Sequence, residues 1–280
     1  ERISVTAASP MEKDAVYFLV INYEAKPTLR AEGVYESWYH SVEKPNEESI
    51  ALITNNKYMD TRRWIPCFDE PSFKAPLTLT LEHSSDLHAR ANSGTRDVRT
   101  EDGGWTKTWF LPTPPLPPHM YAFSLNDYRY DEDKIDDIFV RVAIARYHQV
   151  EVEAILTKVL RALRQMKTKG HRAYFAPFSD DEFPEVTQKL DVLFVPATLE
   201  DIPNFGIISV DDAALIMEHE FDLLLFKALG VHNFNSTLTP VWWSDDWIDS
   251  GLRTKLAFDH AGKYGYRSSH SHIMRHDAYE

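Results

Sequence analysis

The sequence has little of what cross-links a protein or anchors it in a lipid bilayer. It contains one cysteine, Cys67, in 280 residues, so no disulfide can form within the chain. Its apolar runs stay well below the roughly 18 residues that cross a membrane. The chain begins at Glu1 without a basic and then apolar leader. We therefore expect it to be a piece of a longer protein, with any targeting segment outside it.

Positive charge is also scarce. Lys and Arg number 30 against 43 Asp and Glu, which gives a formal net charge of −13. This balance argues against nucleic acid as a partner, because phosphate backbones are bound by an excess of cations. Apolar residues are abundant instead: they make up 43% of the chain, and aromatic residues make up 12%. Such a chain can bury a large core in about two domains.

The first part of the chain carries the patterns of β structure. We predict strands in VYFLVINYEA at 16–25, LTLTLEH at 77–83, GGWTKTWFL at 103–111 and MYAFSLNDYRY at 120–130. The proline-rich PTPPLPP at 112–118 indicates an extended connector. The acidic DEDKIDD at 131–137 is typical of a solvated linker. We therefore place a domain boundary between residues 134 and 135.

After this boundary strands and helices follow one another. We predict strands at 138–147, 190–197 and 205–210, and helices at 150–167, 211–231 and 244–260. The helical segment at 150–167 has apolar residues at helical spacing, whereas the strands are short apolar runs. This order predicts an α+β domain at 135–280 after a β domain at 1–134.

Four motifs together resemble one family, the gluzincin aminopeptidases of the aminopeptidase N type. DTRRWIPCFDEP at 60–71 is similar to the family's DARR-x-x-PCFDEP, and TPVWWSDDWIDSG at 239–251 is similar to TPxWWxDxWLNEG. TPPLPPHMYAFSLNDY at 113–128 and KLDVLFVPA at 189–197 resemble the segments before the domain junction and before the substrate loop. The resemblance implies a saddle- or sandwich-like all-β domain, followed by the first half of a thermolysin-like α+β domain.

The resemblance also implies where a zinc site would be. The family takes two ligands and a general base from H-E-x-x-H on one helix, and a third ligand from a glutamate on the next helix. Counting from TPVWW places the first ligand on Lys227, the base on Ala228, the second ligand on Val231 and the third on Ser250. A lysine ammonium has no lone pair, and alanine and valine have no ligand atom. The sequence therefore predicts that metal and catalytic residues are both absent.

The amine-binding loop departs from the family pattern as well. Asp201–Gly206 stands where the family has G-A-M-E-N-W-G, with a one-residue gap upstream. The glutamate of that motif binds the free ammonium of the peptide. Here Pro203 replaces that glutamate and Asn204 follows it. The family also presents a Gln or Glu to the ammonium from the β domain, and Lys57 stands at that position. A lysine there repels an ammonium instead of binding it.

Two further groups have structural interpretations. We expect the tryptophans of the WW motif and the following turn, Trp242, Trp243 and Trp247, to form core and cleft wall. We expect the charges around PCFDEP to form ion pairs that tie the β domain to its neighbour, namely Arg62, Arg63, Asp69 and Glu70.

These inferences favour a catalytically inactive, aminopeptidase N-like protein without a cofactor. It would act by binding a protein or peptide, in adhesion or in assembly, including as a homodimer or a heterodimer with family members. An extracellular or membrane-anchored ectodomain is the location we expect. Two alternatives stay open: an active zinc metalloaminopeptidase that removes N-terminal residues from peptides, and an intracellular scaffold subunit.

Overall fold

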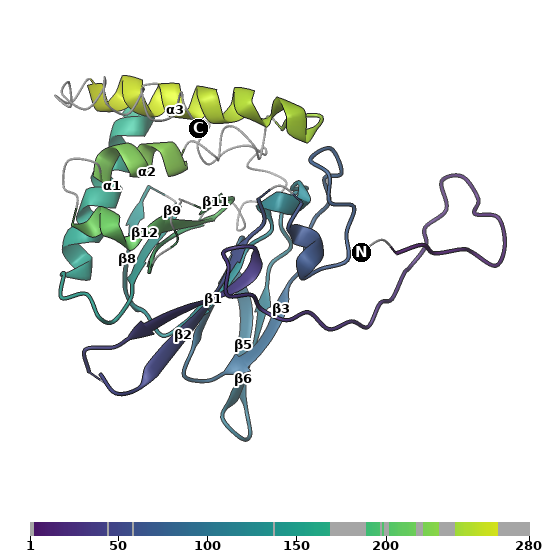
Figure 1. Cartoon of the computed structure of the whole chain (residues 1–280), viewed down its shortest axis with the longest axis horizontal. Coiled ribbons are helices and arrows are strands. Elements are labelled where there is room, and N and C mark those ends of the chain that lie inside the picture. Colours follow the sequence, from purple (N-terminus) through teal and green to yellow (C-terminus); the bar gives the residue numbers. More distant parts are fainter. Residues whose placement is uncertain are drawn as a thin grey trace.

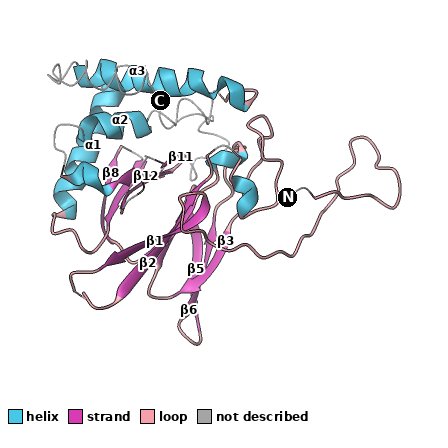
Figure 2. Ribbon diagram, in the orientation of Figure 1, coloured by secondary structure: helices cyan, strands magenta, loops and turns pink. Residues whose placement is uncertain are grey.

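The computed structural model describes residues 3–43, 45–57, 59–136, 138–168, 189–196, 198, 202–216, 221–229 and 239–262. Within them the strands form three sheets, and the α-helices gather on one side of the molecule (Figure 1). Colouring by secondary structure separates this helical side from a strand-rich side (Figure 2). None of the helices in these ranges is both long and apolar enough to cross a membrane.

Two sheets belong to the N-terminal, strand-rich part. The four-stranded sheet has the order β1-β2-β7-β4 and is antiparallel throughout, with β1 at Gly33–His40, β2 at Glu48–Asn55, β7 at Phe123–Asn126 and β4 at His88–Ala91. The three-stranded sheet has the order β3-β6-β5, with β3 at Thr80–Ser84, β6 at Trp105–Phe110 and β5 at Thr95–Glu101. Short 3-10 turns lie at Thr61–Arg63 and Pro118–Met120. The strands predicted at 77–83 and 103–111 are confirmed, with shifted ends. The single strand predicted at 120–130 is wrong, because this segment contains β7 and the start of β8 (Arg129–Ile135), which belong to different sheets.

The strand predicted at 16–25 is wrong. Residues 3–27 contain no strand and extend away from the body of the molecule (Figure 1). Val16 is 81% exposed and Phe18 is 92% exposed. A β-branched, aromatic segment forms a strand only when a neighbouring backbone pairs with it. The described residues place no strand beside this segment.

The third sheet belongs to the second part of the chain. Its order is β11-β12-β10-β9-β8, with β11 at Ile202–Asn204, β12 at Ile207–Asp211, β10 at Lys189–Val195, β9 at Ile138–Ile144 and β8 at Arg129–Ile135. The three central strands run parallel, and both edge strands run antiparallel to their neighbours. The helical elements are α1 at Val152–Thr168, a 3-10 turn at Asp212–Leu215, α2 at Phe221–Leu229, a 3-10 turn at Trp243–Asp245 and α3 at Asp246–Gly262. The alternation of strands and helices predicted for this part is confirmed.

The acidic segment is a strand, so the prediction of a solvated linker at 131–137 is wrong. β8 pairs with β9 along its whole length, and Asp136 turns the chain between them with φ 53°. Because β8 is an edge strand with its acidic side chains exposed, it can carry charge without burying it. The boundary between residues 134 and 135 falls at the end of this strand and stays a prediction.

The third sheet is packed on both faces, as the alternation along β10 shows. Leu190, Val192 and Phe194 are buried in one cluster with residues of α1 and α2. Leu193 and Val195 are buried in another cluster, with side chains of β1 and β2. The sheet therefore lies between a helical layer and the four-stranded sheet.

Asn92 joins the N-terminal part to the third sheet. Its side-chain amide donates hydrogen bonds to the carbonyls of Met120 and Phe205, both at 2.7 Å. Its side-chain oxygen accepts from the Ala122 backbone N–H at 2.6 Å. The next residue in the β11–β12 turn, Gly206, has φ +69°, and a β-carbon there would overlap the Asn92 backbone carbonyl. This close approach requires glycine.

We predict that Gly206→Ala lowers the free energy of unfolding by about 3 kcal/mol, from positive φ plus steric overlap. Gly104→Ala is the matched control, because Gly104 has φ +83° but no atom within 4 Å of its hypothetical β-carbon. It should lose only about 1 kcal/mol. Urea denaturation of both variants measures the difference. Equal losses would show that the contact with Asn92 is not tight.

Candidate functional site

The structure brings the elements of the predicted site together. Lys227 and Ala228 lie on α2, where Lys227 is half-buried and Ala228 is 1% exposed. Ser250 lies on α3 and is partly buried. α2 packs against α3 and also contacts β11. Val231 lies outside the described residues.

The predicted amine-binding residues lie on β11 and after β2. Pro203 sits on an edge strand, where a missing N–H leaves no interior ladder bond broken. Asn204 is buried and donates its amide N–H to the His119 carbonyl at 3.1 Å. Its side chain is thus occupied in holding β11 to the N-terminal part. Lys57 lies in the turn after β2 and is partly buried.

The described residues contain no group of three or more His, Cys, Asp or Glu side chains placed to hold a metal ion. Lys227 forms no ion pair with a carboxylate in the described ranges, and it is half-buried. Within these ranges, the α2–α3 pair presents Lys227, Ala228 and Ser250 at the predicted positions. This arrangement can bind polar groups, but these three side chains include no carboxylate or imidazole.

The tryptophans do not form the expected core. Trp242 is 46% exposed and Trp247 is 72% exposed, whereas Trp243 is partly buried. Trp243 packs edge-on against His119, with ring centroids 5.1 Å apart. The start of α3 projects outward, and the helix buries side chains only further along, at Ala257 and Phe258. The expectation of a core role is wrong for Trp242 and Trp247.

The charges around PCFDEP pair locally. Arg62 donates to Asp69 at 3.0 Å, and Arg63 pairs with Glu32 at 3.0 Å. These partners all belong to the N-terminal part. The expectation that these ion pairs tie that part to its neighbour is wrong for Arg62 and Arg63, because the 3-10 turn at 61–63 faces its own loop. Hydrogen bonds of Asn92 and Asn204 contribute to the junction instead.

One cluster of titratable groups was not predicted. Tyr147 and His148 follow β9, and Asp212 follows β12, so parallel pairing brings them to the same end of the sheet. Tyr147 donates its hydroxyl to the Asp212 carboxylate, and His148 Nε2 lies 2.9 Å from the same oxygen. The sequence does place polar residues directly after two of the strands. Because these residues are more than 60 positions apart in the chain, the sequence alone does not show that they meet.

Burial governs the electrostatics of this cluster. It raises the pKa of Asp212 from its ordinary value to about 6. It also lowers the pKa of His148, with a smaller contribution from the nearby Arg129 guanidinium. Burial therefore favours the neutral forms of both groups, and the Tyr147 hydroxyl holds the carboxyl group in place.

Comparison with known proteins now adds to the geometry. Residues 1–120 match the family described as the peptidase M1 N-terminal domain. This match and the similarity to the relatives given below support a relationship of the chain to the M1 aminopeptidase family. The strand-rich N-terminal part is consistent with that domain.

Relatives extend the similarity beyond residue 120. The chain is 23% identical to aminopeptidase N of Haemonchus contortus over 279 residues, which covers 94% of this chain and 27% of the relative. It is 26% identical to aminopeptidase N of Rattus norvegicus, over 81% of this chain and 24% of the relative. It is 24% identical to aminopeptidase N of Homo sapiens, over 92% of this chain and 27% of the relative. The chain thus spans about a quarter of the length of these relatives.

The raised pKa of Asp212 predicts a pH dependence of stability. Because the folded state holds this proton up to about pH 6 and the unfolded state releases it near pH 4, the contribution of Asp212 is favourable below pH 4 and is lost as the pH rises to 6. Asp212→Asn should remove this pH-dependent loss of stability. Its free energy of unfolding should rise relative to that of wild type by on the order of 2 kcal/mol between pH 4 and pH 7.

Urea unfolding at several pH values between 4 and 7 measures this difference. Asp102→Asn, in the exposed turn between β5 and β6, controls for the loss of one carboxylate far from the cluster. If Asp212→Asn follows the wild-type profile, Asp212 is not the group whose protonation differs between the folded and unfolded states.

Proposed function

We propose that this chain is part of an aminopeptidase N-like protein that has lost the zinc site and acts by binding another protein or a peptide. The observation that carries the proposal is the chemistry at Lys227, Ala228 and Ser250, on two helices that pack together. A cation, a methyl group and a hydroxyl stand where the family needs an imidazole, a carboxylate and a second carboxylate. A zinc ion would then lack its protein ligands, and a water bound to it would lack its general base.

The thermolysin-like identity of the second part belongs to this proposal. The third sheet, which has antiparallel edge strands and helices on one face, supports it. So do the positions of the two helices that would carry the ligands, because α2 packs against α3 and also contacts β11. The occupied amide of Asn204 and the proline at 203 further support the loss of amine binding. The family's activity would then be absent for two separate reasons.

Binding is the role left to such a scaffold. The first turn of α3 exposes Trp247 and Ile248, by 72% and 46%. Large apolar side chains exposed in this way are available for contact with a protein partner. This supports a protein partner, including assembly with family members, over a free-standing peptidase. An active zinc aminopeptidase remains the alternative that the first experiment separates.

We predict that the protein, purified without chelator, holds far less than one zinc per chain. It should also release no fluorophore from an aminoacyl-coumarin reporter above background. Elemental analysis by mass spectrometry and a fluorescence assay measure the two quantities. Stoichiometric zinc together with turnover would establish the active alternative instead.

A repair experiment tests the assignment of the positions. Lys227→His, Ala228→Glu, Val231→His and Ser250→Glu together should restore zinc binding at least in part, because the two helices already adjoin. Turnover should stay low, because Pro203 offers no carboxylate to the substrate ammonium. That lost bond corresponds to roughly tenfold to over a hundredfold in rate.

The matched control restores only the amine site. Pro203→Glu, with one residue inserted upstream, should raise turnover in the repaired protein and give none in the wild-type background. Full turnover from the four-residue repair alone would mean that the loop is misassigned.

A further inference from the structure

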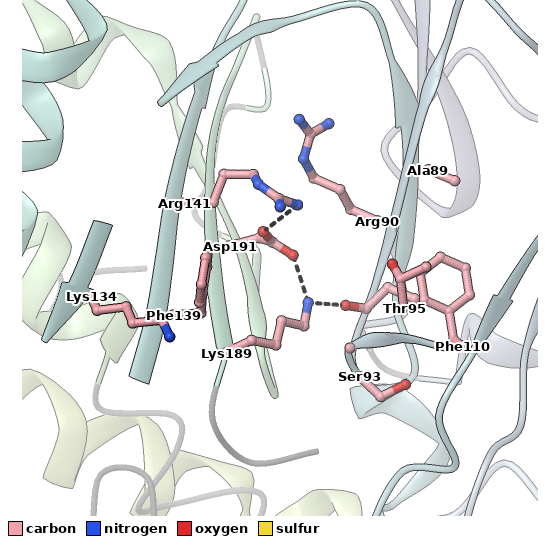
Figure 3. Close-up of a pocket in the computed structure, with 12 residues that line it drawn as sticks. Ala89, Arg90, Ser93, Thr95, Phe110, Lys134, Phe139, Arg141, Lys189 and Asp191 are labelled. Atoms are coloured by element: carbon pink, nitrogen blue, oxygen red, sulfur yellow. Dashed lines mark hydrogen bonds and ion pairs between the residues drawn. The ribbon is translucent and has the colours of Figure 1, made fainter. Parts of the chain in front are cut away.

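A cavity lies between the N-terminal strands and the third sheet, away from the predicted peptide site. It has a volume of about 340 Å³, far more than the roughly 10–15 Å³ that one water needs. One wall comes from β4, the turn after it and the adjoining ends of β5 and β6, and the other comes from β8, β9 and β10 (Figure 3). Pro203 and Asn204 lie on β11, at the opposite edge of the sheet.

The charges that line the cavity are strongly unbalanced. Four cations line it, namely Arg90, Lys134, Arg141 and Lys189, against one carboxylate, Asp191. Strand pairing explains the grouping, because Arg141 lies opposite Asp191, and Phe139 lies opposite both Lys189 and Lys134. Paired residues share a face of the sheet, so these side chains project toward the same space. A local excess of cations stands out in a chain of net charge −13.

The one carboxylate is already engaged. Asp191 binds Lys189 at 2.6 Å and Arg141 at 3.5 Å, and Figure 3 shows both contacts on one side of the cavity. Burial by itself would raise the pKa of Asp191, but Lys189, Arg141 and Arg90 together lower it below its ordinary value. Arg141 also pairs with Glu132 at 2.7 Å. These contacts offset part of the positive charge on the side of the cavity formed by β9 and β10.

Arg90 lies on the opposite wall and makes no direct ion pair among the described residues, although the Asp191 carboxylate acts on it from a longer distance. It is 3% exposed, and its Nη1 donates to the neutral Asn126 amide oxygen at 3.0 Å. Its Nε is buried and has no hydrogen-bond partner among the described residues. Its guanidinium lies 5.2 Å from the centroid of the Tyr130 ring, and that of Arg141 lies 5.3 Å from the same ring. Two guanidinium groups thus converge beside one aromatic ring.

A buried cation without a direct ion pair is unfavourable unless an anion binds it. Desolvation lowers the pKa of Arg90 to about 10, so the group still carries its charge at neutral pH. Such a group gains most from a ligand that supplies negative charge and an acceptor to the unused Nε–H. Oxyanions with several acceptor oxygens match arginine in this way.

We propose that this cavity binds a phosphate group, held by Arg90 and Arg141 with Lys134 at its mouth. Phosphate combines two negative charges near neutral pH with acceptor oxygens for donors on opposite walls. The site is independent of the proposed loss of zinc. Lys134 is exposed and lies over Phe139, with its Nζ 5.1 Å from the ring centroid. It is therefore placed to attract an anion without being needed for the fold.

Inorganic phosphate is the first probe, titrated calorimetrically at constant ionic strength in a zwitterionic buffer at pH 7.5. We expect one saturable site per chain. Arg90→Met should weaken binding at least tenfold, and Lys134→Met about threefold. Arg99→Met is the matched control, because Arg99 is an exposed arginine that pairs with Asp97 at 2.9 Å and contacts Trp109 outside the cavity. Its affinity should equal that of wild type.

A second readout separates binding from folding. Without phosphate, Arg90→Met should keep or raise the melting temperature, because a buried unpaired charge is removed. Phosphate should raise the melting temperature of wild type and of Arg99→Met, but not that of Arg90→Met. If Arg90→Met does not fold, the test is the threefold loss of phosphate affinity expected for the exposed Lys134→Met variant.

The source of the phosphate group is resolved by comparing inorganic phosphate with glycerol 3-phosphate. Tighter binding of the ester indicates a phosphorylated metabolite, and binding of inorganic phosphate alone indicates the free ion. Citrate tests the class of ligand. The proposal is overturned by non-saturable binding, by wild-type affinity in both Arg90→Met and Lys134→Met, or by citrate binding more tightly than both phosphates.

Discussion

The hydrogen bonds of Asn92 are a central link between the N-terminal part and the third sheet. One amide side chain ties the segment before β7 to the turn between β11 and β12, and it is buried. Because Phe205 directly follows Asn204, the same contacts fix the loop that would meet a substrate amine. Ala91 and Ser93, on either side of Asn92, line the basic cavity. A single short side chain therefore positions two separate candidate sites.

The sequence predicted the fold best where a strand or helix packs on an apolar layer. α1 and β10 were recognised because period 3.6 and continuous burial leave clear patterns. β8 was missed because its acidic side chains face solvent at a sheet edge, where charge is tolerated and the pattern resembles a linker. The opposite error occurred at 16–25, where an apolar, β-branched pattern has no paired neighbour among the described residues. The hydrophobic pattern of a segment shows which structure the segment prefers, whereas strand pairing also depends on which other segments lie next to it.

The candidate sites divide in the same way. Lys227, Ala228 and Ser250 were assigned by counting from a motif, and the structure places these residues on adjoining helices, while their assignment to the zinc positions stays a prediction. The cluster at Asp212 and the basic cavity could not be found by counting. Their members come from strands that are distant in the chain and become neighbours only through parallel pairing. The overall acidity of the chain also concealed four cations that line one space.

The two-faced burial of β10 has a consequence for insertions and deletions. Lys189 and Asp191 share one face with Leu193, whereas Val192 and Phe194 face the helices. A one-residue slip would exchange the two sets and carry an ion pair into the helical layer while turning valine toward the cations. Changes of length should therefore be excluded from this strand and tolerated at the Gly103–Gly104 turn, which lies in the solvent. Comparing related chains by where they gain or lose residues would reveal this constraint even when the residues themselves differ.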